Sequence, residues 1–160
     1  KIVHPERRTA AGEPFKVKAP DFTTAMLEFE CGALMRLTAN FYVLKMTPNP
    51  TGVEFHGDTG SALVESWFAF NSTVKAAAFS EPLEAVPLDY PQAYEGVEWS
   101  RGLQDLADAI RNNRPHRASA EHAAHVVEIL KAINTSVENR GAPMAVSSSF
   151  PLPEPWQPLG

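Results

Sequence analysis

WSRGLQDLADAIR, residues 99–111, is the stretch that decides the fold, together with SAEHAAHVVEILKAINTSVENRG at residues 119–141. Apolar residues recur every three or four positions in both runs, which predicts two amphipathic helices. We expect the hydroxyls of Ser100 and Ser119 to cap the N-termini, and Gly141 to end the second helix. The predicted buried stripes are Leu103, Leu106, Ala107 and Ile110, and Ala123, Val126, Val127, Leu130, Ile133 and Val137. The sides predicted to face solvent carry Gln104, Asp105 and Asp108, and Glu121, Glu128, Lys131 and Glu138.

Upstream of these helices the hydrophobic period changes from 3.6 to 2, which is the alternation of a half-buried strand. Glu30–Gly32 and Gly57–Gly60 have the composition of turns, so the strands around them are expected to form antiparallel hairpins. The sequence therefore predicts an α+β fold, with an open, predominantly antiparallel β-sheet and helices packed on one face. The expected strands lie near 22–29, 33–43, 52–57, 61–67 and 71–77, with an edge strand near 144–146.

One face of the first expected hairpin is unusually apolar. Phe22, Met26, Leu34 and Tyr42 alternate outward on its two strands, among the polar residues Thr24, Arg36, Thr38 and Asn40. So much apolar area is unfavourable in water if it is contiguous. Either a loop covers this face of a bent sheet, or the face forms a symmetric subunit interface, which we prefer.

Composition bounds the class of protein. The 160 residues suit a single domain, 1–160, with a Pro-rich tail over 147–160 and a core that needs no disulfides. A net charge of −5 argues against nucleic acid as a partner. Cys31 is the single cysteine, and no apolar run approaches the length of a membrane helix or resembles a signal peptide. We therefore expect a soluble, cytoplasmic protein with no membrane partner.

Motifs that carry chemistry are scarce. The chain has no glycine-rich nucleotide loop, no Walker loop and no nucleophile elbow. His122 and His125 share a helix face, but a metal needs three or four convergent ligands, so no metal site is predicted. His56 has no suggestive neighbour in sequence. The start of the first helix is the most interesting polar spot, because Trp99 and Arg101 can receive an anion or a flat ring there. The alternative is that Trp99 packs beneath the helix start and Arg101 is solvated.

The order and spacing of several loose patterns resemble the C-terminal domain of the Gfo/Idh/MocA oxidoreductases, the relatives of glucose-fructose oxidoreductase and inositol dehydrogenase. No single pattern is diagnostic, and the resemblance covers residues 17–152. The patterns are APDFTTAMLEF (19–29), VEFHGDTGSAL (53–63), RGLQDLADAI (101–110), RPHRAS (114–119) and HVVEIL (125–130).

The resemblance implies a two-domain enzyme. In that family an N-terminal Rossmann domain binds NAD or NADP, and the C-terminal domain shapes the sugar or polyol site and assembles dimers or tetramers through its open sheet. The family's Glu-Lys-Pro motif and its helix with an aspartate before a histidine do not occur here, so we assign no catalytic and no cofactor-binding residue. The segment 98–102 aligns with the family region that approaches nicotinamide and substrate. Trp99 and Arg101 are therefore the candidate substrate-facing residues.

Two functions are compatible with these patterns. The first is the substrate-shaping and oligomerisation domain of an NAD(P)-dependent oxidoreductase that acts on a sugar, polyol or related hydroxyl compound, inactive without its nucleotide domain. The second is a non-catalytic binding or scaffold module that uses the open sheet for association. A Gly-x-Gly-x-x-Gly strand–helix unit encoded upstream would support the enzyme.

Overall fold

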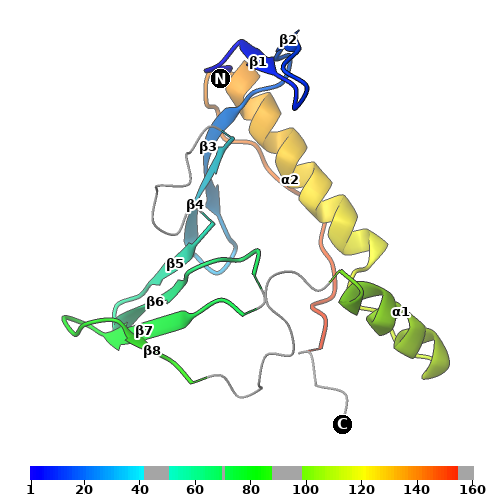
Figure 1. The fold of residues 1–160 in the computed structure, drawn as a ribbon. Helices are drawn as coiled ribbons and strands as arrows, with labels where there is room; N and C mark the ends of the chain where they lie inside the picture. Colours follow the sequence, from blue (N-terminus) through cyan, green and yellow to red (C-terminus); the bar gives the residue numbers. More distant parts are fainter. Residues whose placement is uncertain (42–50, 70, 88–98, 155–160) are drawn as a thin grey trace. The chain divides into compact units, whose positions relative to one another are not determined.

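The structure is a computed structural model that describes residues 1–41, 51–69, 71–87 and 99–154. It divides into two compact units, Lys1–Pro50 and Thr51–Gly160, which are described separately (Figure 1). The described strands pair in antiparallel sheets and are accompanied by two helices. The α+β class predicted from the sequence is therefore confirmed.

The first unit holds two hairpins. In the longer one, the amide of Phe29 donates to the carbonyl of Ala33 at 2.9 Å, and Gly32 takes a φ of 85° that favours glycine. The register pairs Ala25 with Leu37 on one face of the hairpin and Met26 with Arg36 on the other. The alternation in the sequence predicted this assignment of residues to the two faces. The strands are β1 (Glu6–Arg8) paired with β2 (Pro14–Lys16), and β3 (Phe22–Glu28) paired with β4 (Leu34–Asn40).

The N-terminal arm of this unit is held by a buried carboxylate. Asp21 is only 4% exposed, and its two carboxylate oxygens accept the amides of Val3 and His4 at 2.6 and 3.0 Å. Arg7 lies 4.0 Å from the same carboxylate and donates to the carbonyl of Phe41. The Val3 amide is the chief reason why the pKa of Asp21 lies below its ordinary value. The arm is thus fixed by hydrogen bonds, which explains why the short strand β1 forms there.

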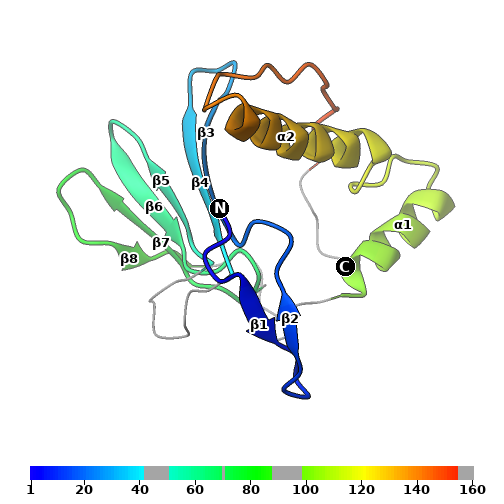
Figure 2. The same ribbon diagram turned by 90° about the horizontal axis from the view of Figure 1, so that it is seen from above.

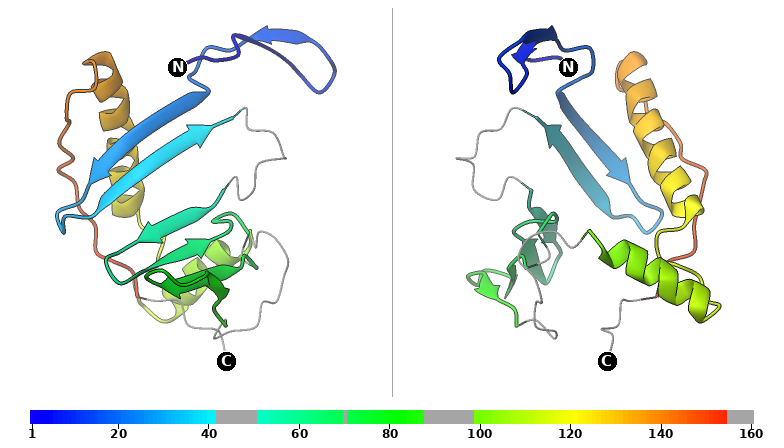
Figure 3. Two further views of the ribbon diagram at one scale, coloured as in Figure 1. Left: turned by 90° about the vertical axis from the view of Figure 1, so that its left-hand side faces the viewer. Right: turned by 45° about the vertical axis from the view of Figure 1, so that its right-hand side comes forward.

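The second unit begins with a four-stranded antiparallel sheet (Figure 3). Gly60 is essential to its packing, because a Cβ there would lie 2.3 Å from the carbonyl oxygen of Ala77. The turn between the first two strands is closed by the Gly57 amide, which donates to the Gly60 carbonyl at 2.9 Å. The strands follow the order β5 (Val53–His56), β6 (Gly60–Val64), β7 (Val74–Ala78) and β8 (Glu84–Ala85).

The two helices of the second unit are α1 (Arg101–Arg111) and α2 (Ala120–Glu138). Ser119 caps α2 as predicted, since its hydroxyl accepts the amide of His122 at 3.1 Å. Ser100 is the N-cap residue of α1, but its side chain makes no capping hydrogen bond because its backbone is already helical. Neither helix, among the described residues, combines the length and apolar character that a bilayer crossing requires.

The faces of the helices differ from the sequence prediction. The apolar side chains expected to be buried are largely exposed on both helices, among them Leu103, Ile110 and Val127. Asp105, Asp108 and Glu128, all expected to face solvent, are half-buried. The physical reason is that the loop and tail that flank the helices supply polar partners, and these cover the polar sides. The packing of the helices on one sheet face stays a prediction.

Some strand boundaries also need correction. The edge strand expected near 144–146 is not a strand, because that segment runs back along α2 instead. The three short strands β1, β2 and β8 were not predicted. In the described residues the strands form three sheets, so their union in one open sheet stays a prediction, as does the single domain. Tyr42, expected on the apolar face, lies outside the described residues.

Candidate functional site

Three aromatic side chains from distant parts of the second unit meet before the start of α1. The ring of Trp99 lies 6.3 Å from the ring of Phe68, and Phe68 lies 5.5 Å from Trp67, with both pairs edge to face. Trp99 is 79% exposed and Trp67 is 67% exposed. An edge-to-face arrangement fixes the orientation of the rings while leaving much of their surface in contact with solvent. We call Trp67, Phe68 and Trp99 the aromatic cluster.

A loop after β6 holds two members of the aromatic cluster in place. The Ser66 hydroxyl accepts the amide of Phe68 at 3.2 Å and meets the hydroxyl of Thr51 at 2.7 Å. The amide of Ser66 donates to the Ser72 hydroxyl at 2.7 Å, and the amide of Trp67 donates to the Thr51 carbonyl at 2.9 Å. These bonds satisfy the backbone of a short turn without burying its aromatic side chains. The loop can therefore present Trp67 and Phe68 at the surface.

Trp99 and Arg101 differ in their exposure, and neither lies as the packing interpretation expects. Trp99 does not pack beneath the helix start, because most of its ring is exposed and its neighbour is Phe68. Arg101 is the first residue of α1 and is half-buried, so it is not a fully solvated side chain either. Sequence analysis identified Trp99 but missed Trp67 and Phe68. The dipeptide follows a strand, but nothing in the sequence indicates that it meets a residue some thirty positions later.

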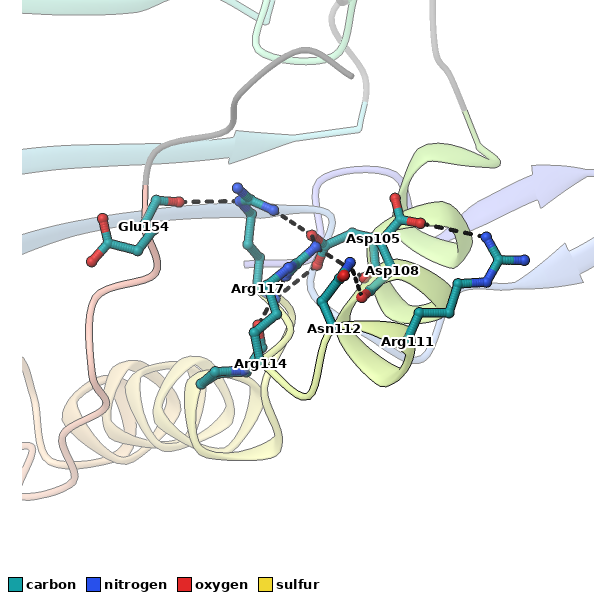
Figure 4. A network of polar contacts seen from close by, with 8 residues as sticks. Asp105, Asp108, Arg111, Asn112, Arg114, Arg117 and Glu154 are labelled. Carbon is teal, nitrogen blue, oxygen red and sulfur yellow. Dashed lines mark hydrogen bonds and ion pairs between the residues drawn. The ribbon is translucent and has the colours of Figure 1, made fainter. Parts of the chain in front are cut away.

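A second polar centre lies at the junction of α1 and the following loop (Figure 4). The Asp105 carboxylate accepts the Arg117 amide at 2.9 Å and the Arg114 guanidinium at 2.8 Å, and it also bonds the Arg117 guanidinium. The Arg117 amide is the main cause of the lowered pKa of Asp105, and both guanidinium groups add to it. Arg114 and Arg117 lie in the loop that follows α1, and both side chains bind Asp105. This centre joins α1 to the loop that follows it.

The tail after α2 runs back along that helix (Figure 2). The Glu128 carboxylate accepts the amides of Ser147 and Ser148 at 3.0 and 2.9 Å. The Ser148 hydroxyl and these amides lower the pKa of Glu128 from 4.5 to about 2. Further along, His122 stacks on Phe150 with ring centroids 4.2 Å apart. We call residues 147–154 the strap, which occupies the face of α2 that carries both histidines.

The second unit also contains a serine, a histidine and a carboxylate in series on neighbouring strands. Ser61 Oγ lies 3.0 Å from His56 Nδ1, and His56 Nε2 lies 3.4 Å from Glu54 Oε2. Sequence analysis treated His56 as isolated, which is wrong. The signal was present, because alternate residues of a strand share a face and the predicted turn places Ser61 opposite His56.

Among the described residues, no group of three or more His, Cys, Asp or Glu side chains is placed to hold a metal ion. No protein-family model, curated protein or solved structure matches the chain. The site must therefore be argued from its own residues.

Proposed function

We propose that this chain is the substrate-shaping and oligomerisation part of an NAD(P)-dependent oxidoreductase that acts on a sugar, a polyol or a related hydroxyl compound. The observation that carries the proposal is the exposed aromatic cluster at the start of α1, centred on Trp99. Aromatic faces accept the apolar C–H face of a ring-shaped substrate, and arginine supplies fixed donors for its oxygens. Trp99 would support the substrate, and Arg101 beside it would orient a polar group.

The cofactor part of the proposal rests on the resemblance to the Gfo/Idh/MocA oxidoreductases. In such an enzyme NAD or NADP is held mainly by a separate nucleotide-binding domain, and the hydride passes between its nicotinamide and the substrate carbon. This chain would then shape the substrate side of the site and be inactive alone. The proposal also places the protein in the cytoplasm, which suits a chain with one exposed cysteine.

The assembly part of the proposal is supported by one face of the β3–β4 hairpin. Met26 and Leu34 are 65% and 69% exposed, and the register makes them diagonal neighbours. Half-buried Phe22 belongs to the same face. Large exposed apolar side chains gathered on one face of a hairpin favour an association site. The expected partner is a second copy of the chain, in a dimer or tetramer.

The enzymatic proposal is tested by expressing the chain together with the coding sequence that precedes it. Reduction of NAD or NADP is followed by absorbance while hexoses and polyols are supplied in turn. We expect Trp99→Ala to lower kcat/KM by about tenfold and Trp99→Phe to retain most of it, because the phenyl ring keeps an aromatic face. A preceding sequence without a nucleotide-binding unit, or a Trp99→Ala variant with unchanged kinetics, would contradict the proposal.

The assembly proposal is tested by light scattering at high micromolar concentration. Met26→Lys should dissociate the oligomer, because an unpaired ammonium is costly to bury. Glu30→Lys places a lysine in the adjacent turn, with a change of two charges instead of one, and should still leave the mass unchanged. A wild-type chain that is monomeric, or a Met26→Lys variant with the wild-type mass, would contradict the proposed interface.

A further inference from the structure

The β5–β6 hairpin places three chemically complementary side chains on one face. Glu54 and His56 are two residues apart on β5, so they point to the same side of the strand. Ser61 on β6 is the register partner of His56. The carboxylate, the imidazole and the hydroxyl therefore follow one another across the sheet surface, and we call Glu54, His56 and Ser61 the hairpin triad.

The backbone of the hairpin restrains this arrangement. The turn after His56 is closed by the bond from the Gly57 amide to the Gly60 carbonyl, which sets the register of the two strands. On the other side, Gly60 passes so close to Ala77 that β6 cannot shift without losing that contact. Both strands that carry the hairpin triad are thus held by neighbours, so the spacing of the three side chains follows from the register.

One protonation state of His56 satisfies both of its contacts. With the proton on Nε2, the ring donates to Glu54 Oε2 and accepts the Ser61 hydroxyl proton at Nδ1. That is the tautomer a general base needs, because the nitrogen facing the hydroxyl carries a lone pair. Once His56 has taken the proton, the Glu54 carboxylate stabilises the imidazolium. Both Glu54 and His56 are well exposed, so a small acyl substrate can reach them.

We propose that the hairpin triad is an acyl-transfer site that accepts small activated carboxylic esters, with Ser61 as the nucleophile, His56 as the base and Glu54 as the group that orients His56. Ser61 Oγ forms a bond to the ester carbonyl carbon while its proton passes to His56 Nδ1. The bond to the alcohol oxygen then breaks, and the leaving oxygen takes that proton from His56. Water then gives a proton to His56 while its oxygen bonds to the acyl carbon. The bond from that carbon to Ser61 Oγ breaks, Oγ takes the proton back from His56, and a carboxylic acid leaves, so water is the only further reactant.

The proposal is tested with p-nitrophenyl acetate in a Cys31→Ser background, because the exposed thiol of Cys31 would itself react with an activated ester. Release of p-nitrophenolate is followed by absorbance, and mass spectrometry of the proteolysed chain locates the acetyl group. We expect the acetyl group on Ser61. Ser61→Ala should lower the protein-dependent rate by about 100-fold, the lower end of what a positioned base supplies. Glu54→Gln should lower it by about fivefold, since an exposed carboxylate is a weak partner.

Ser148 provides a matched control. Its hydroxyl also meets a histidine, with His125 Nδ1 at 2.9 Å, but Glu128 engages the serine and not the far side of the ring. Ser148→Ala should therefore leave ester hydrolysis unchanged. His56→Gln should abolish acetylation of Ser61, because the hydroxyl then has no base to take its proton.

The outcomes separate the alternatives. Circular dichroism shows whether each variant keeps its fold, and His56→Gln tests the site even if Ser61→Ala is unstable. A Ser61→Ala variant with wild-type rate, or acetyl groups on lysine or histidine alone, would overturn Ser61 as the nucleophile. Equal losses in Ser61→Ala and Ser148→Ala would overturn the special role of the hairpin triad.

Discussion

Asp21 and Asp105 perform the same structural task in the two units with different partners. Each carboxylate ties a separate segment to a regular element, and they are 4% and 10% exposed. Asp21 is bound mainly by the amides of Val3 and His4, whereas Asp105 receives one amide and two guanidinium groups. Amides are fixed by the backbone and are dipoles, whereas guanidinium groups carry full charges on flexible stems. Added salt should therefore have little effect on the stabilisation that Asp21 provides, and it should reduce the stabilisation that Asp105 provides.

The largest effect is expected when Asp105 is lost. Asp105→Ala leaves the guanidinium groups of Arg114 and Arg117 facing each other without the carboxylate between them, and it frees the Arg117 amide. Because both arginines are partly exposed, we expect a loss of about 2 kcal/mol in the free energy of unfolding. Urea denaturation followed by circular dichroism measures it. A loss that does not shrink at high salt would show that the charges contribute little.

Asp21→Ala should release the N-terminal arm while leaving the β3–β4 hairpin paired. The amides of Val3 and His4 lose their acceptor, so their hydrogen exchange should accelerate by about tenfold. The amide of Phe29, which closes the hairpin turn, is the internal control and should exchange as before. If Phe29 accelerates equally, Asp21 supports the whole unit and not only the arm.

Acid should release the strap from α2. The pKa of Glu128 is lowered from 4.5 to about 2, so its bonds to Ser147 and Ser148 stabilise the folded state above about pH 4.5 and lose that contribution as the pH falls toward 2. The amide chemical shifts of these serines should titrate with a midpoint near pH 2, at the acid end of that range. In Glu128→Gln the strap lacks the charged acceptor and the titration should vanish. A midpoint near the ordinary value of a glutamate would mean that the hydrogen bonds are not made in solution.

Arg111→Ala should have the smallest effect. Arg111 is the last residue of α1 and is well exposed. Its guanidinium group lies 3.8 Å from the Asp108 carboxylate, which is a long distance for an ion pair. An exposed ion pair at this spacing contributes about 0.3 kcal/mol. The same urea experiment should place this variant close to wild type. If Arg111→Ala lost as much free energy of unfolding as Asp105→Ala, the half-buried Asp105 centre would be no more stabilising than an exposed ion pair.

Local signals in the sequence were sufficient for much of the fold. The Glu30–Gly32 turn was predictable because glycine there adopts a positive φ, and α2 was predictable from the capping serine Ser119 to Gly141. The short strands β1 and β8 were not, since two or three residues carry no periodicity and exist only through their partners. The covered side of each helix is set by the path of the segment that follows it, the loop after α1 and the strap after α2. The spacing of apolar residues within a helix carries no information on that path.

The candidate sites show the same division. Trp99 was found because it precedes a helix start, but its neighbour Phe68 belongs to a loop that sequence alone does not bring near. The Ser61–His56 contact was accessible to sequence reasoning, because a short hairpin turn fixes which residues face each other. Asp105 was assigned to the wrong side of its helix, since a carboxylate and two later arginines are also the ordinary composition of a solvated surface.

The strap has a mechanical polarity that follows from its direction along α2. Its contacts run from Ser147 at Glu128, through Phe150 at His122, to the Glu154 carbonyl, which accepts Arg117 Nε at 3.1 Å. A load applied beyond Glu154 meets these contacts one after another, so the strap peels at low force instead of shearing all its bonds at once. A load transmitted through Gly141 would stretch the last turn of α2 first. The same hydrogen bonds would thus resist tension unequally according to the end from which the chain is pulled.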